Sequence, residues 1–170
     1  AVEPSISWDE EGDRVVVGGY DGFLVFDLTT GTRSPLAWPG GDASSTVLWP
    51  RFGPNNRVYY TAADGIGGWD LRYANLDGTS AGWMVQGSRF PNNDFHLDWS
   101  PSGEAFVFTA DWETENDYFL RISDEAADVI TSLSVEGVTP VWSPDGSLYY
   151  VSGSLVYRIL GAEFFTRSLY

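Results

Sequence analysis

The chain has 170 residues, of which 43% are hydrophobic and 16% aromatic, and it carries a net charge of −15 and no cysteine. Phosphates need a basic footprint, so this acidic balance argues strongly against nucleic acid as a partner and equally against an anionic membrane surface. The absence of cysteine excludes disulfides, thiolate metal sites and cysteine nucleophiles. We expect the surplus of carboxylates to serve solubility, and a cation-binding surface is the alternative.

One short phrase occurs four times along the chain: an aromatic residue, a polar turn, and then a β-branched or aromatic run. The aromatic residues, called anchors below, are Trp8, Phe52, Trp99 and Trp142. They are 44 (52 − 8), 47 (99 − 52) and 43 (142 − 99) residues apart. A period in the low forties with strand-like content is typical of β-propeller blades rather than of helical repeats.

Each repeat is predicted to hold four antiparallel strands, and no helix is expected. The first strand of a repeat ends at its anchor, and turn residues separate the others. The remaining predicted strands are, blade by blade, 14–17, 23–28 and 32–37; 58–61, 69–76 and 83–86; 105–108, 118–122 and 129–133; and 148–151, 155–160 and 164–170. The sequence therefore predicts an all-β, single-domain β-propeller over residues 1–170, with blades at about 5–42, 46–90, 94–135 and 138–170.

Two of the anchor phrases resemble the repeat of TolB-like β-propellers. These are Trp-Ser-Pro-Ser-Gly at 99–103 and Trp-Ser-Pro-Asp-Gly at 142–146. The residues have an architectural explanation, since Pro sets a turn and Asp-Gly tolerates a tight reversal. The resemblance implies a periplasmic or otherwise extracytoplasmic scaffold that binds protein partners.

Ring closure is the feature in which the chain departs from that family. The resemblance implies six or more blades and a strand borrowed between the termini, whereas here each repeat is complete in sequence. The four blades either close on themselves, form half of a larger ring that another chain completes, or belong to a longer protein. An open arc of four blades would expose apolar faces that a soluble protein must cover.

The sequence offers no catalytic constellation. The single histidine, His96, stands near Asp94 and Asp98, but no Gly-x-Ser-x-Gly phrase accompanies it. We expect His96 to be packed or to line the channel. Four acids lie within 111–117, where oxygen ligands for Ca²⁺ are available, yet the spacing is not that of a helical calcium loop. We therefore expect a solvated acidic loop and no cofactor, with calcium as the alternative.

Recognition is expected on the loops that gather at one face of the blades, where propellers usually carry function. Exposed aromatic and Arg side chains among carboxylates and amides would form a recognition surface or stack on a sugar ring. The alternative is that the tryptophans only cap the core. The candidate binding residues are Tyr20, Asp21, Trp38, Asp42, Asp64, Arg89, Phe90, Asn92, Asp111, Trp112 and Glu113.

These observations predict a non-enzymatic, extracellular or periplasmic propeller that acts as a protein-interaction or self-assembly module. Its expected partners are another protein or copies of itself, with neither nucleic acid nor membrane insertion. The first alternative is a carbohydrate-binding propeller that takes a glycan. The second is an accessory propeller of a larger secreted hydrolase.

Overall fold

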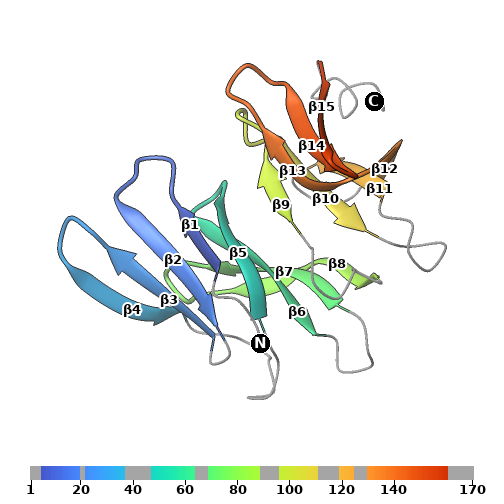
Figure 1. Ribbon diagram of the computed structural model, residues 1–170. Coiled ribbons are helices and arrows are strands. Elements are labelled where there is room, and N and C mark those ends of the chain that lie inside the picture. The colour runs from blue at the N-terminus through green and yellow to red at the C-terminus, as the bar shows by residue number, and fades with distance from the viewer. Residues whose placement is uncertain are drawn as a thin grey trace. The chain divides into compact units, whose positions relative to one another are not determined.

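The computed structural model describes residues 5–19, 22–36, 47–63, 69–88, 96–110, 119–124 and 130–160 (Figure 1). These residues form fifteen strands, and none of them is helical. They divide into two compact units, 1–87 and 88–170, and each unit is described by itself. The described part of the chain holds no helix that could cross a bilayer.

The first unit contains two four-stranded antiparallel blades, in the strand orders β1-β2-β3-β4 and β5-β6-β7-β8. Their strands are β1 (Ser5–Trp8), β2 (Arg14–Gly19), β3 (Gly22–Asp27), β4 (Thr32–Leu36), β5 (Val47–Gly53), β6 (Arg57–Ala63), β7 (Trp69–Asn75) and β8 (Ala81–Ser88). Both blades are therefore meanders in which each strand pairs with its neighbour in sequence, as the repeats predict.

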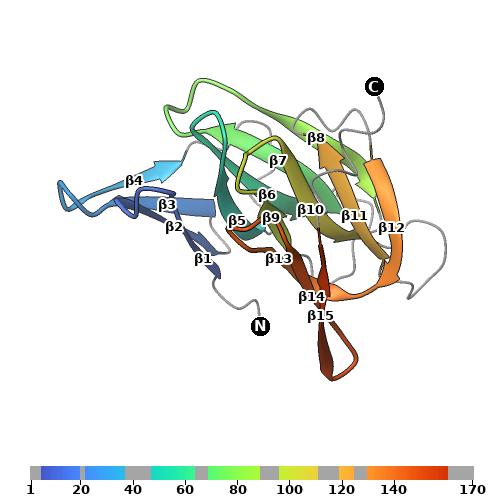
Figure 2. The same cartoon turned by 90° about the horizontal axis from the view of Figure 1, so that it is seen from above.

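The second unit repeats this arrangement, in the orders β9-β10-β11-β12 and β13-β14-β15 (Figure 2). Its strands are β9 (Leu97–Trp99), β10 (Ala105–Ala110), β11 (Phe119–Asp124), β12 (Ile130–Glu136), β13 (Val138–Trp142), β14 (Leu148–Ser152) and β15 (Leu155–Ile159). The strand predicted at 164–170 lies outside the described residues. The predicted all-β fold built of antiparallel propeller blades is confirmed.

Within each unit, the two blades pack face to face through an apolar core. In the first unit Val16 and Phe23 of blade 1 meet Val58 and Tyr60 of blade 2. In the second unit, Val107 and its neighbours on blade 3 meet a group on blade 4 that comprises Trp142, Leu148 and Tyr150. Because side chains alternate along a strand, this packing fixes which face of each blade is turned away from its partner.

The turn after each anchor requires a left-handed backbone, which explains the glycine of the repeated phrase. Gly12, Gly103 and Gly146 have φ values of 76°, 72° and 77°. In blade 2 the corresponding position is Asn56, with φ of 55°, and the preceding Asn55 also has a left-handed φ, of 60°. Asparagine tolerates this region better than other side chains, so the looser second phrase makes an equivalent turn.

The blades alternate between two types. In blades 2 and 4 a proline two residues before the anchor follows a residue with left-handed φ, at Trp49 (56°) and Thr139 (54°), and the strand pairing shifts there. Blades 1 and 3 carry no proline at that position. Blade 1 therefore corresponds to blade 3, and blade 2 to blade 4, so the structural repeat is a pair of blades.

Anchor pairing shows the same alternation. Trp8 stands opposite Val15, seven residues later, and Trp99 opposite Phe106. In the other two blades the partner is six residues later, as for Trp142 and Leu148. Because side chains alternate along a strand, this one-residue difference decides which residues of the second strand share the face of the anchor.

Candidate interaction surfaces on the first and fourth blades

The eleven loop residues proposed as a recognition surface all lie outside the described residues, so that proposal stays a prediction. The same holds for the acidic loop at 111–117. His96 is described; it is half-buried and directly precedes β9. Among the described residues, no three His, Asp or Glu side chains are grouped as a metal site would require.

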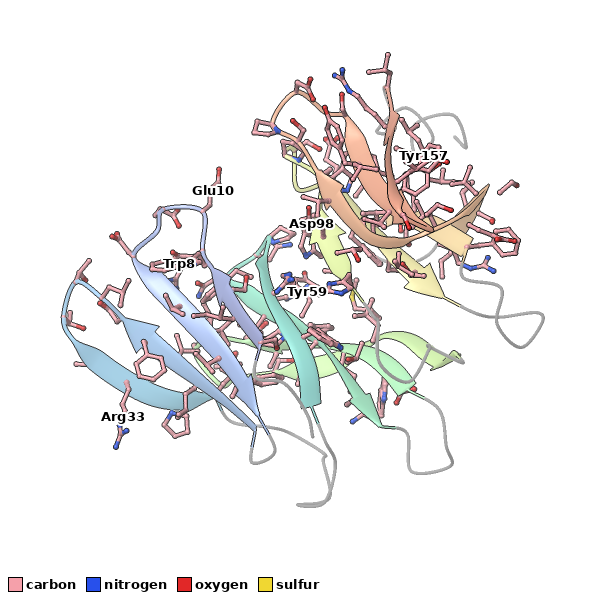
Figure 3. All side chains as sticks on the ribbon, in the orientation of Figure 1. Trp8, Glu10, Arg33, Tyr59, Asp98 and Tyr157 are labelled. Carbon is pink, nitrogen blue, oxygen red and sulfur yellow. The ribbon has the colours of Figure 1, made fainter. Side chains whose placement is uncertain are left out.

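An apolar face of blade 1 is exposed to solvent. It is the face opposite to the one that packs on blade 2, and we call it the outer face of blade 1. Ile6 and Trp8, two residues apart on β1, are each 56% exposed. Leu24, in the same cross-strand row as Ile6, is 39% exposed. Leu28, directly after β3, is 50% exposed. Figure 3 labels Trp8 on this sheet.

Trp8 differs sharply from the corresponding anchor at the other end of the repeats. Trp142 occupies the same position in blade 4 and is only 6% exposed, because it packs into the core between blades 3 and 4. A fully covered tryptophan side chain buries roughly 150–250 Å², so the exposure of Trp8 leaves a large apolar contact unused. The outer face of blade 1 is therefore shaped like a blade-packing face that lacks a covering blade within its own unit.

Blade 4 exposes the face that lies opposite to its anchor, Trp142. Val141 on β13 is 50% exposed and Val156 on β15 is 70% exposed, and Leu160 just beyond β15 is 69% exposed. Tyr149 pairs with Val141 and with Arg158, so these three form one cross-strand row. We call this the outer face of blade 4. It combines aliphatic side chains with one aromatic–arginine pair.

The arginine of that face is held in place by neighbouring groups. The Nη2 atom of Arg158 donates to Asp145 Oδ2 at 2.8 Å and to Ser147 Oγ at 2.7 Å, and its guanidinium lies 5.6 Å from the ring centre of Tyr149. Hydrogen bonds from Ser147, followed by smaller contributions that include the charge of Arg158, lower the pKa of Asp145. The positive charge on the outer face of blade 4 is thus locally balanced.

The packed faces inside the units show what a finished junction contains. In the first unit, Ser7 Oγ accepts a hydrogen bond from the backbone N–H of Phe52 (3.3 Å). In the second, Asp98 Oδ2 accepts one from the backbone N–H of Trp142 (2.6 Å). In both cases the residue before one anchor supplies an oxygen to the anchor of the next blade. We call this hydrogen bond the clasp; it joins the first strands of the two blades in a unit, β1 to β5 and β9 to β13.

A second polar contact reinforces the junction in the first unit. Arg14 donates from Nε to Asp9 Oδ2 at 2.7 Å and from Nη1 to Asn56 Oδ1 at 2.9 Å, so it connects the turns of blades 1 and 2. Burial acts to raise the pKa of Asp9, but the hydrogen bonds and charge of Arg14 outweigh it and hold that pKa below 3.8. The junction therefore joins apolar packing to an internal ion pair.

Blade 2 carries another exposed tryptophan, which belongs to neither outer face. Trp83 on β8 is 57% exposed, and its indole Nε1 donates to Asp70 Oδ2 at 3.2 Å. Asp70 also accepts from Arg72 Nη2 at 2.7 Å, and Arg72 lies 5.6 Å from the Trp83 ring centre. These contacts fix the ring, so Trp83 is a rigid surface aromatic with an exposure close to that of Trp8.

The repeated phrase predicts architectural roles for the anchors and does not single out Trp8 or Val156 as surface residues. The sequence predicts only that an open arc of blades would expose apolar faces. It did not identify the residues, since that requires the cross-strand register.

The comparisons with solved structures support the fold. TolB from Acinetobacter baumannii superposes with a TM-score of 0.70 at 20% identity, over 92% of this chain and 40% of that chain. A TolB protein from Agrobacterium tumefaciens gives 0.74 at 16% identity, over 93% and 58%. A puromycin-hydrolyzing peptidase of Mycobacterium tuberculosis gives 0.67 at 14% identity, over 95% and 27%.

The chain therefore has a TolB-like β-propeller fold, and it spans less than two thirds of the length of each of these proteins. At such identities the likeness concerns the fold and not the activity. No protein-family model matches the chain, and no curated protein sequence matches it either.

Proposed function

We propose that the protein is a non-enzymatic interaction module whose partners dock on the outer faces of its first and fourth blades. The observation that carries the proposal is the exposure of Ile6 and Trp8, 56% each, on a face of the type that is buried elsewhere in the chain. Aromatic side chains at the centre of an apolar patch are the residues that dominate protein–protein binding.

The surrounding chemistry fits a protein partner. Both outer faces are mainly aliphatic and aromatic, and a contiguous apolar patch on a soluble protein commonly marks an interaction site. The net charge of −15 opposes non-specific association, so binding depends on complementary faces rather than on charge attraction. A location outside the cytoplasm accords with the fold shared with TolB.

Photocrosslinking in cells of the source organism tests this function. A photoreactive phenylalanine analogue replaces Leu24, which is 39% exposed on the outer face of blade 1, and a control protein carries the analogue at Thr30 in an exposed turn of the same blade. We expect one discrete protein adduct from position 24, identified by mass spectrometry, and none from position 30. Equal yields at both positions, or no adduct at position 24, contradict the proposal.

A propeller subunit of a larger hydrolase is the second candidate. It is favoured by the match to the puromycin-hydrolyzing peptidase, of which the chain covers 27%. In that case the outer faces would contact further parts of the same polypeptide. Sequencing the gene on both sides of the region that encodes this chain decides the matter, because a contiguous catalytic domain supports the hydrolase.

A further inference from the structure

The alternation of blade types indicates that the outer faces of blades 1 and 4 are complementary. We call blades 1 and 3, which lack the proline before the anchor, first-type blades, and blades 2 and 4, which carry it, second-type blades. Each unit holds one blade of each type, in that order. Inside a unit, the side of the first-type blade that lies opposite to its anchor packs against the anchor side of the second-type blade. The two outer faces are the complementary pair: blade 1 offers the anchor side of a first-type blade, and blade 4 offers the opposite side of a second-type blade.

We propose that the outer face of blade 4 packs against the outer face of blade 1 of a second copy of this chain, head to tail. The inference rests on the proposed function and names the partner. In a pair of copies that makes this contact twice, all four outer faces are covered, whereas a head-to-tail contact made only once would continue into an open polymer.

A corresponding residue on blade 2 supports this pairing. Tyr59 in blade 2 occupies the position of Tyr149 in blade 4, seven residues after the anchor, and Tyr59 is fully buried. Phe106 in blade 3 corresponds to Val15 in blade 1, opposite the anchor, and Phe106 is also fully buried. The blade 2 residue that corresponds to Tyr149 on the outer face of blade 4 is thus buried, while Val15 on the outer face of blade 1 is itself only 5% exposed, beside the exposed Trp8.

The main chain of blade 1 offers a second observation. The N–H of Asp9 donates to the carbonyl oxygen of Arg14 at 3.1 Å. Hydrogen-bonded and non-bonded pairs alternate in an antiparallel ladder, so the neighbouring pair of Trp8 and Val15 is non-bonded. The N–H of Trp8 is therefore directed away from β2, as are the anchor N–H groups that make the clasps in both units. A strand edge in this state is a surface for another chain.

The side chains at the two faces suit a direct contact. Val141 precedes the anchor of blade 4, at the position where Ser7 and Asp98 carry oxygen acceptors. An aliphatic residue there, 50% exposed, supplies apolar area to Trp8 but no side-chain acceptor, so the N–H of Trp8 must bond to a backbone carbonyl or to water. The contact is therefore apolar in character, and salt should strengthen it because each copy carries a net charge of −15.

Two substitutions block one face each. Ile6→Asp places a carboxylate on the outer face of blade 1, and Val156→Asp does so on the outer face of blade 4, where the native residues are 56% and 70% exposed. Leu155→Asp is the matched control, because Leu155 is 61% exposed on the same strand but alternates to the opposite side. Circular dichroism and urea midpoints confirm that all three variants fold.

Sedimentation equilibrium at about 0.5 M salt, where the Debye length falls to several ångströms, measures the mass. We expect the native protein and the Leu155→Asp variant to reach twice the 18.8 kDa of one chain and to rise no further with concentration. Ile6→Asp alone and Val156→Asp alone should each stay at one chain. A mixture of those two variants should form a one-to-one pair, because each contributes one intact face.

The mixture separates the possible geometries. If Ile6→Asp pairs with itself, blade 4 contacts blade 4, and if Val156→Asp pairs with itself, blade 1 contacts blade 1; either result overturns the head-to-tail proposal. A native protein that remains a single chain at millimolar concentration overturns it as well. In that last case an adduct from position 24 in cells would still support the interaction function, so the two failures are distinguishable.

Discussion

The hydrogen bond between Asp98 and the backbone of Trp142 should be one of the strongest single contacts between blades 3 and 4. Its 2.6 Å length and charged acceptor place it in the class of charge-assisted bonds. We predict that Asp98→Leu, which keeps the approximate shape and removes the acceptor, lowers the free energy of unfolding by about 1.5–3 kcal/mol. Asp98→Asn retains an oxygen acceptor and should recover at least half of that loss.

The magnitude follows from the state of the donor. Trp142 is 6% exposed, so its N–H cannot easily exchange the lost acceptor for water. A buried donor left without an acceptor costs about 1–3 kcal/mol. The comparison of leucine with asparagine separates the acceptor from the charge, since both replacements are neutral.

Urea unfolding followed by tryptophan fluorescence measures this difference. With a slope of about 1–3 kcal/mol per molar urea, the leucine variant should shift the midpoint by roughly 1 M. Equal midpoints for the leucine and asparagine variants would refute the reasoning, because the oxygen acceptor would then carry no stability. A shift in slope without a shift in free energy would refute it too.

Three further outcomes are expected. Gly18→Ala should lower the free energy of unfolding by about 1–3 kcal/mol in urea titrations, since an added Cβ would lie 2.7 Å from the rigid Pro50 ring; an unchanged midpoint contradicts this packing. Hydrogen bonds from the backbone of Thr30 and the side chain of Thr29 lower the pKa of Asp27 from 3.8 to about 2. The stability from Asp27 is therefore full above about pH 3.8 and is lost as pH falls towards 2, so Asp27→Asn should flatten the acid limb of the stability profile between those values, and an unaltered limb would count against it. Raising salt from about 0.05 to 0.5 M should tighten self-association by weakening the repulsion between copies, and light scattering that shows the reverse would point to a contact held by opposite charges.

Much of the fold was accessible from the sequence, because the anchors mark the end of each inner strand. The phrase at 142–146 predicts a tight turn, and the structure places Gly146 in the left-handed region as that turn requires. The blade positions follow from the spacing of the anchors. Strand ends differ by a few residues, as for β12, predicted at 129–133 and observed at Ile130–Glu136, because period-two alternation does not specify where pairing stops.

The pairing of blades into a larger repeat was accessible but unrecognised. The signal was the proline two residues before the anchor, Pro50 and Pro140, together with spacings of 91 (99 − 8) and 90 (142 − 52) residues between like anchors. The outer faces could not be predicted residue by residue. Trp8 and Trp142 have the same place in the phrase, and only tertiary packing makes one exposed and the other buried.

Hydroxyl-radical footprinting of the native protein tests most directly whether the outer face of blade 1 is an interaction surface. Trp8 and Trp83 have nearly equal exposures, 56% and 57%, so Trp83 serves as an internal reference of the same residue type. As protein concentration rises through the range of association, oxidation of Trp8 should fall several-fold while that of Trp83 stays constant. Protection of Trp83 in place of Trp8, or equal oxidation of both at every concentration, would contradict docking on the outer face of blade 1.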